Sequence, residues 1–365
     1  MSMHQNYQET TRLTAFKTPP SLVTEPIATS SYTIPRPKLI DELIKRVECF
    51  RIIRVNAPPA SGKTTLMNLM INSFARKVRD NVGSAGGWAG YLERETGANG
   101  HCWLVYPAFL FIDDAQQSYW DGELWAAFFK SIEPAVIPYV VLFTSYCLPN
   151  SGSPHLFEEK YVKVPMNFAS EQQISLKANK ITFGHLWRPV GLLLQKDEAR
   201  RLVTQYASEV VSSPVALITR DLKSSLFQCS NGHIGVLISL VEDIQSLMRQ
   251  KIIINRQMAC ESLFSDPLAF FKAMKGKCFT KGLPESKDLG ESAIYHIFTT
   301  ASDEHVFFVD SFCETDRGDS RRQAVEKTWR NGWLQAEYPE TNFGDLSLVF
   351  ATEIHRWGVK MEGRI

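Results

Sequence analysis

The chain has 365 residues, which at roughly 150 residues per domain corresponds to two or three domains. Hydrophobic residues make up 44% and charged residues 22%, so the chain can bury a sizeable core and is neither wholly disordered nor fibrous. The 40 Lys and Arg residues balance 39 Asp and Glu residues, so no global positive field favours nucleic-acid or membrane binding.

Seven scattered cysteines contain no C-x-x-C pair, which argues against a disulfide framework and a zinc ribbon. No apolar run approaches the roughly 18–20 residues of a membrane helix. The first thirty residues lack the apolar segment of a signal peptide, and their Thr, Ser, Pro and Gln content predicts a flexible leader over residues 1–30. We therefore expect an intracellular protein without membrane contact.

Hydrophobic patterning predicts an α/β domain over residues 31–170. Residues 35–50 place apolar side chains at helical spacing, and residues 51–55 form a short apolar strand pattern. The next predicted elements are strands at 77–82, 108–112 and 139–143, a glycine-rich loop with one short helix over 81–100, and a helix containing Leu124, Trp125, Phe128 and Phe129. Apolar strands alternating with helices indicate a parallel sheet covered on both faces.

The pattern is mainly helical after residue 170. Helices are expected over 197–208 and 216–230, and Asn231-Gly232 marks the end of the second. The helix that follows has one apolar stripe, formed by Ile234, Leu237, Ile238, Val241, Ile244 and Met248. We predict a helical block over 171–275, and a third block over 276–365 with short helices, aromatic strands and a polar loop over 314–322.

A phosphate-binding loop is indicated directly after the first strand. The run N-A-P-P-A-S-G-K-T-T ends in the core of a Walker A motif, between a strand and a helix. Gly62 lets the backbone amides turn toward phosphate oxygens, Lys63 reaches the β- and γ-phosphates, and the Thr64 hydroxyl is a ligand for Mg²⁺. The helix N-terminus faces the same anion. The expected nucleotide-binding residues in this loop are Ala57, Pro58, Ala60, Ser61, Gly62, Lys63, Thr64 and Thr65.

The loop departs from the usual motif in two ways. Ala57 replaces the leading glycine, and the two prolines donate no amide hydrogen. The alternative is a chance G-K-T in a loop rich in small residues.

The strand at 108–112 ends in Asp113-Asp114, the arrangement of a Walker B motif. Open α/β sheets bind ligands at this carboxyl edge. Asp113 is expected in the Mg²⁺ shell, and Asp114 stands where many ATPases have a glutamate that orients the attacking water. The strand at 139–143 ends in Thr144, whose hydroxyl can sense a γ-phosphate. The alternative interpretation of Asp113-Asp114, and also of Thr144, is a solvent-exposed turn after the strand without a role in nucleotide binding.

Several runs resemble a known class. I-P-R-P-K-L-I-D-E-L (34–43), the phosphate loop and N-G-H-I-G (231–235) resemble the STAND class of signal-transduction P-loop NTPases. The runs F-I-D-D-A-Q-Q-S-Y-W-D (111–121), V-L-F-T-S-Y (141–146), R-N-G-W-L (330–334) and I-H-R-W (354–357) are similar to the NTPase module of crinkler-type proteins of fungi and oomycetes.

The resemblance implies a P-loop domain, a helical lid and a winged-helix-like domain around one ATP. It also implies that Arg36 lies near the adenine and that His233 reads the phosphate state. The alternatives are a surface arginine and a core or capping histidine. We expect a cytoplasmic location, and a crinkler-like protein would instead be nuclear or secreted into a host. Asp114 replaces the usual glutamate of the resembled motif, a departure that concerns hydrolysis and not nucleotide binding.

Three readings remain at this point. The first is an ATP-driven switch with slow Mg²⁺-dependent hydrolysis, and the second is a nucleotide-binding interaction module without turnover that contacts a protein partner or another copy of itself. The third is a crinkler-type fragment acting on nucleic acid, which the near-zero net charge disfavours.

Overall fold

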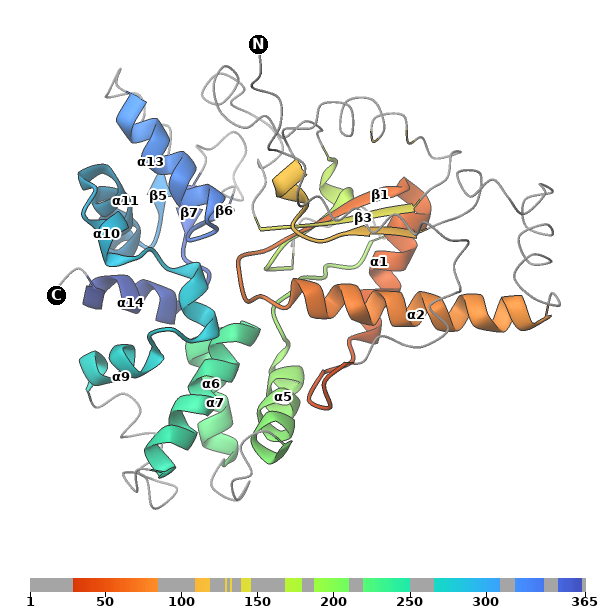
Figure 1. The fold of residues 1–365 in the computed structure, drawn as a ribbon, viewed down its shortest axis with the longest axis horizontal. Coiled ribbons are helices and arrows are strands. Elements are labelled where there is room, and N and C mark those ends of the chain that lie inside the picture. The colour runs from red at the N-terminus through yellow and green to blue at the C-terminus, as the bar shows by residue number, and fades with distance from the viewer. Residues whose placement is uncertain are drawn as a thin grey trace, which may run out of the picture.

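The computed structural model describes residues 29–84, 109–118, 129, 132, 139–145, 168–178, 187–209, 219–249, 266–308, 319–337 and 347–362. Figure 1 shows three groups of elements: a sheet with long helices, a bundle of helices drawn in green, and a C-terminal group drawn in blue. We call these the sheet block, the helical block and the C-terminal block. Among the described residues, no helix is both long and apolar enough to span a membrane.

The sheet block contains four parallel strands in the order β2–β3–β1–β4. The strands are β1 (Ile52–Asn56), β2 (Phe109–Ile112), β3 (Tyr139–Thr144) and β4 (Gln173–Ile174). Asn56 is in register with Thr144, so β1 and β3 end level with each other. The parallel sheet confirms the predicted α/β class, and β1, β2 and β3 confirm the strands predicted at 51–55, 108–112 and 139–143.

Two helices cover one face of this sheet. Helix α1 (Pro37–Phe50) begins with a proline, as helices often do, and confirms the helix predicted over 35–50. Helix α2 (Lys63–Ser84) follows the loop after β1. Their apolar faces share one core with the same side of β1 and β3, which contributes Ile53, Val55, Val141 and Phe143.

The strand predicted at 77–82 is wrong, because α2 runs through these residues. Val78 and Val82 are four residues apart, a spacing that fits one face of a helix as well as it fits strand alternation. The short helix and loop predicted over 81–100 begin inside α2, and residues 85–100 lie outside the described part of the chain, as do the leader up to residue 28 and residues 121–128.

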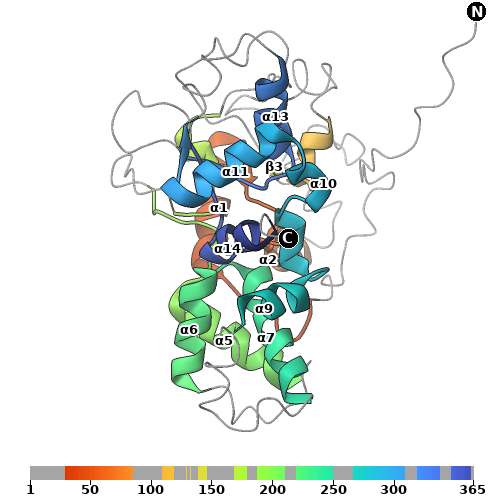
Figure 2. The same ribbon diagram turned by 90° about the vertical axis from the view of Figure 1, so that its left-hand side faces the viewer.

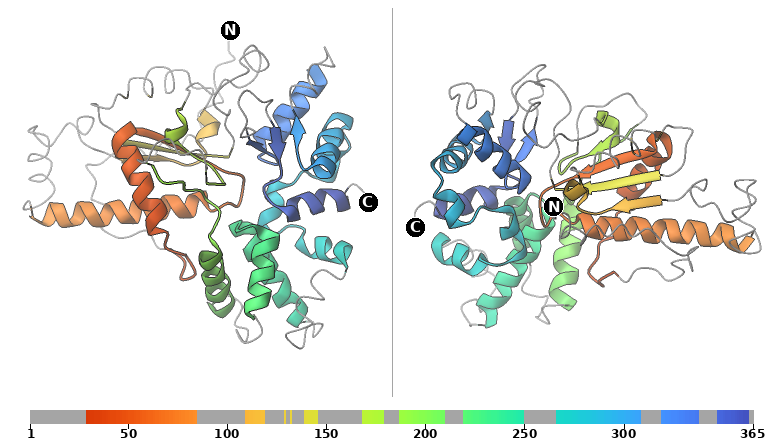
Figure 3. Two further views of the ribbon diagram at one scale, coloured as in Figure 1. Left: turned by 180° about the vertical axis from the view of Figure 1, so that it is seen from behind. Right: turned by 45° about the horizontal axis from the view of Figure 1, so that its top comes forward.

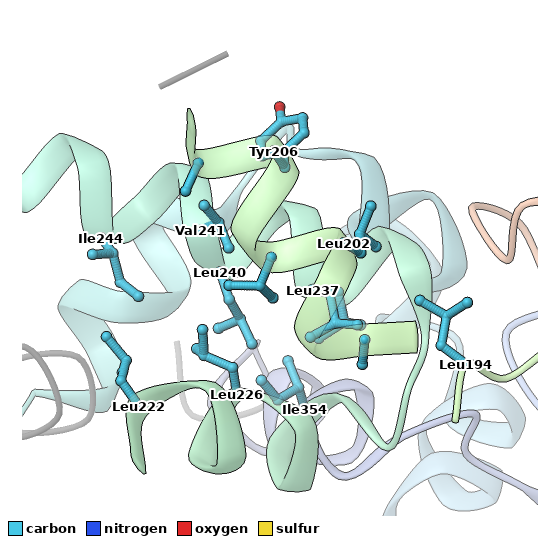
Figure 4. Close-up of a cluster of buried hydrophobic side chains, with 14 of the residues drawn as sticks. Leu194, Leu202, Tyr206, Leu222, Leu226, Leu237, Leu240, Val241, Ile244 and Ile354 are labelled. Carbon is cyan, nitrogen blue, oxygen red and sulfur yellow. The ribbon is translucent and has the colours of Figure 1, made fainter. Parts of the chain in front are cut away.

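The helical block consists of α5 (Lys196–Glu209), α6 (Arg220–Ser230), α7 (Ile234–Arg249), α9 (Pro267–Met274) and the short 3-10 helix η7 (Cys278–Gly282). Helices α5, α6 and α7 confirm the helices predicted over 197–208, over 216–230 and after Asn231-Gly232. Helix α6 begins at Arg220, and residues 216–218 lie outside the described part of the chain. Thr219 caps α6 by accepting a hydrogen bond from the Leu222 amide at 3.2 Å, and Asn231 ends α6 in the left-handed conformation. Figure 4 shows the apolar side chains that α5, α6 and α7 bury between them.

The C-terminal block combines helices with a three-stranded antiparallel sheet in the order β5–β7–β6. Its elements are α10 (Ser286–Leu289), α11 (Ser292–Glu304), β5 (Phe307–Phe308), α13 (Asp319–Arg330), β6 (Gln335–Glu337), β7 (Ser347–Val349) and α14 (Glu353–Glu362). The polar loop predicted over 314–322 is wrong in its second half, because α13 begins at Asp319. The short polar side chains there suit the first turn of a helix as well as a loop. The winged-helix assignment and the domain boundaries stay predictions.

The three blocks share side chains at their borders. Ile34 and Ile354 are buried in the core of the helical block, and Ala351 is buried in the core of the sheet block. Figure 2 shows α14 between α11 and the green helices. Both views of Figure 3 show the loop between β1 and α2 on the side of the sheet that faces the other two blocks.

Candidate functional site

The loop between β1 and α2 contains two residues in the left-handed region, Ala60 with φ +60° and Gly62 with φ +89°. Alternation of this kind can turn successive backbone amides toward one point, as the predicted phosphate-binding loop would need. The Ala57 amide donates to the Thr144 carbonyl at 3.1 Å, which ties the start of the loop to the end of β3. The loop is therefore held at its base by the neighbouring strand.

The Lys63 side chain folds back onto the loop between β1 and α2. Its Nζ donates to the carbonyl oxygens of Ala57 at 2.9 Å and Pro58 at 3.1 Å, and the side chain is buried. These bonds use two of the three donors of an ammonium group. Burial lowers the pKa of Lys63, while the charges of Asp114 and Asp113 act in the opposite direction. Ala57 and Pro58 thus position the lysine through their carbonyl groups.

Thr64 and Asp113 meet at the edge of the sheet. The Thr64 hydroxyl donates to Asp113 Oδ2 at 2.6 Å, although the two residues are far apart in the sequence. Both side chains are exposed at this edge. A hydroxyl beside a carboxylate offers the hard oxygen ligands that Mg²⁺ prefers, and the pair would complete its shell with phosphate oxygens and water. The donor set therefore fits the predicted metal.

Asp114 lies next to the pair in a left-handed turn, with φ +50°. Its Oδ1 accepts a hydrogen bond from Gln116 Nε2 at 3.1 Å, and Gln116 Oε1 accepts one from the Ser145 amide at 3.1 Å. The glutamine thereby bridges the ends of β2 and β3 and orients the Asp114 carboxylate. Our sequence interpretation did not assign this role, although the spacing D-x-Q within one turn is visible in the sequence.

Thr144 is fully buried at the end of β3, and its hydroxyl donates to Asn56 Oδ1 at a long 3.4 Å. Asn56 is the last residue of β1, and its side chain was not singled out in the sequence. Parallel strands that end level with each other bring the two polar groups together. The phosphate-sensing role of Thr144 stays a prediction.

His233 lies immediately before α7 and is buried beside the phosphate loop. Its Nδ1 accepts a hydrogen bond from the Val236 amide at 3.4 Å, so a neutral ring carries its proton on Nε2. No described residue bonds to His233 Nε2, although that atom is buried. Burial holds the pKa of His233 well below its usual range, and His355 and Lys63 lower it further. The imidazole is thus a neutral donor.

The start of α7 contacts the phosphate loop directly. The Gly235 amide donates to the Ala60 carbonyl at 3.0 Å. A Cβ atom on Gly62 would lie 2.6 Å from Ile234 Cδ1, so a larger residue would have to displace this side chain, and the positive φ of Gly62 favours glycine as well. The N-G-H-I-G run therefore lies against the loop.

Arg36 holds the segment that leads into the helical block. Its guanidinium donates to the carbonyls of Leu192 at 2.7 Å, Gly191 at 3.0 Å and Leu193 at 3.1 Å, and pairs with Glu198 at 3.3 Å. Burial lowers the pKa of Arg36, and Glu198 opposes that shift. These contacts stabilise the connection, and the adenine contact stays a prediction.

The two remaining loop residues differ in exposure. Ser61 is buried, and no described residue bonds to its hydroxyl. Thr65 is exposed in the first turn of α2. His355 was noted in the sequence only for family resemblance, yet its ring lies 5.3 Å from that of His233, between centroids. Thr352 Oγ1 lies 2.8 Å from His355 Nδ1 and fixes this second ring.

Comparisons with known proteins give distant structural matches alone. No protein-family model matches the chain, and no curated protein matches it. A solved variant of Thermotoga maritima RuvB is similar at a TM-score of 0.36 and 12% identity, over 87% of this chain and 92% of that chain. A chain from the structure of Drosophila ORC bound to DNA is similar at a TM-score of 0.32 and 10% identity, over 100% and 96%. These values are too low to assign an activity.

Proposed function

We propose that this protein is a P-loop NTPase that binds ATP with Mg²⁺ and hydrolyses it slowly, as a nucleotide-dependent switch. The observation that carries the proposal is the meeting of Thr64 and Asp113 at 2.6 Å beside Lys63. A lysine, a hydroxyl and a carboxylate from two segments converge where a strand enters a helix, which is the arrangement that phosphoryl transfer uses.

Each residue of the site has a distinct role in this proposal. Lys63, oriented by two loop carbonyls, binds the β- and γ-phosphates. Thr64 and Asp113 hold Mg²⁺, which when bound neutralises charge on the phosphate oxygens. Asp114, oriented by Gln116, positions the attacking water and accepts its proton.

The helical block supports the switch. His233 presents a buried Nε2 donor near Lys63, and α7 bonds to Ala60. We propose that the histidine binds a phosphate oxygen only when the helical block is closed, so that nucleotide shifts the balance between open and closed forms. The resemblance to STAND and crinkler-type modules favours the same interpretation, with the helical block as lid and the C-terminal block as winged helix.

Single-turnover hydrolysis of ATP with Mg²⁺ tests the proposal. Asp114→Asn keeps a side chain that tolerates the left-handed turn, so it removes the charge without changing the backbone. We expect the variant to bind ATP as the wild type does and to hydrolyse it about a hundredfold more slowly. Asp113→Asn is the matched contrast, because it weakens Mg²⁺-dependent binding itself.

Two results would contradict this assignment. Equal hydrolysis rates in wild type and Asp114→Asn would remove Asp114 from the reaction, and Gln116 would become the next candidate. Binding without any hydrolysis by the wild type would favour the alternative, an interaction module without turnover.

A further inference from the structure

The turn after α13 lies against the phosphate loop. Gly332 follows the last residue of this helix by two positions, has φ +66° and is buried. A Cβ atom on Gly332 would lie 2.8 Å from Pro59 Cδ, 3.6 Å from Pro58 Cα and 3.4 Å from the Ser145 carbonyl oxygen. The turn therefore contacts the loop that follows β1 and the residue that follows β3.

Both sides of this contact are restrained. The pyrrolidine rings of Pro58 and Pro59 fix φ at two consecutive positions of the loop, which removes two of its rotations. The turn itself is held by the Gly332 amide, which donates to the Trp329 carbonyl at 2.9 Å, and by Trp333, which is buried in the core of the C-terminal block. Restraint on both sides favours transmission of a displacement from one to the other.

The contact between the Gly332 turn and the prolines is linked to Lys63 through Pro58. Pro58, which lies beside Gly332, is also one of the two residues whose carbonyls position Lys63. The two prolines that depart from the usual phosphate-loop sequence are thus the residues that the Gly332 turn contacts.

We propose that Gly332 is a positioning residue of the nucleotide site, supplied by the C-terminal block. Its turn braces Pro58 and Pro59 and keeps the phosphate loop in the shape that holds Lys63. Because coupling between two sites is reciprocal, nucleotide in the loop also strengthens docking of the C-terminal block. This second statement rests on the proposed nucleotide binding.

The structure provides a matched pair of variants. Gly332→Ala places a methyl group against the Pro59 ring at a positive φ. Gly276→Ala imposes the same kind of backbone strain, since Gly276 has φ +81° and also lies two residues after a helix, but a Cβ atom there meets nothing within 4 Å. The difference between the two variants isolates the contact with the phosphate loop.

Hydrogen exchange without nucleotide is the first measurement. We expect Gly332→Ala to speed exchange of the amides from Ala60 to Thr64, and Gly276→Ala to leave them unchanged. Titration with Mg-ATP is the second, and we expect roughly five- to tenfold weaker binding for Gly332→Ala alone. In the wild type, Mg-ATP is expected to slow exchange of the amides from Asn331 to Leu334.

If the loop amides of Gly332→Ala exchange as in the wild type, the turn does not hold the loop and the proposal is wrong. If they exchange faster but Mg-ATP binds with unchanged affinity, Gly332 does not position the nucleotide site. If the wild type binds no nucleotide, the proposed function is wrong. The exchange rates of the loop amides without nucleotide, compared between the wild type and Gly332→Ala, would still test whether the turn holds the loop. If Gly332→Ala does not fold, the wild-type measurement decides: no slowing at Asn331 to Leu334 with bound Mg-ATP contradicts the proposal.

Discussion

The protonation of His233 follows from where its side chain lies. The ring is buried beside a second imidazole and near Lys63, and all three factors favour the neutral form. Thr352 orients the facing His355 ring, and the carboxylates of Asp114 and Asp113 act on the charge of Lys63. A neutral histidine in this place can donate a hydrogen bond from Nε2 without adding a charge to the site.

This protonation predicts how stability depends on pH. The unfolded chain binds a proton at His233 below about pH 6.5, whereas the folded chain does so only at much lower pH. The native state therefore loses stability as the pH falls below the unfolded value. For this one group we expect a loss of about 1 kcal/mol at pH 5.5 relative to pH 7.5, which His233→Gln abolishes. Urea unfolding at the two pH values measures it.

His296→Gln, which changes an exposed histidine on α11, is the control for that comparison. The assignment fails if His233→Gln and the wild type lose the same amount of stability between the two pH values.

At the level of elements, α1 is anchored by a buried ion pair. Arg46 Nε donates to Glu42 Oε1 at 3.0 Å, and the same carboxylate oxygen accepts the Arg188 amide at 2.9 Å. Arg46 also donates to the carbonyls of Glu171 at 3.2 Å and Arg188 at 2.8 Å. The pair therefore fixes α1 to the segments that contain Glu171 and Arg188.

Removing one charge of this pair leaves the other buried and uncompensated. We expect Glu42→Gln to lower the free energy of unfolding by about 3 kcal/mol, measured by urea denaturation. Asp41→Asn changes the neighbouring, exposed carboxylate of the same helix and is expected to change stability by less than about 0.5 kcal/mol. Similar losses in both variants would mean that the buried pair has no special role.

Local patterns explain which elements could be predicted. The apolar run of β2 and the apolar stripe of α7 are each visible within about fifteen residues. The predicted phosphate loop and the two aspartates after β2 are likewise recognised from short sequence motifs. The errors come where local signals are ambiguous, as with Val78 and Val82 in α2 and with Asp319 at the start of α13.

The contacts that complete the site could not be predicted in this way. Gln116 on Asp114, Gly235 on Ala60 and Gly332 on Pro59 join segments whose distance in space depends on the packing of whole blocks. A single sequence contains no periodic signal for such pairs. The positive φ at Gly332 is suggested by the sequence N-G, but the surface that it contacts is not.

At the scale of the whole molecule, the loop between β1 and α2 is one place where all three blocks meet. It leaves the sheet at β1, accepts the Gly235 amide of the helical block at Ala60, and supports the turn of the C-terminal block at Pro59. A ligand that changes the loop therefore acts on two neighbouring blocks at once. A two-state switch requires a ligand whose contacts differ between its two conformations, and a ligand in this loop can meet that requirement.

Calorimetric titration of Mg-ATP into the wild type and Lys63→Ala tests the central claim most directly. Loss of a buried lysine that binds phosphate removes roughly 1.5–3 kcal/mol of binding free energy for each bond lost, so we expect tight binding to the wild type and at least about tenfold weaker binding to the variant. Lys38→Ala, which changes an exposed lysine of α1, is expected to bind as the wild type does. Equal affinity of the wild type and Lys63→Ala, or no binding by either, would contradict a nucleotide site at this loop.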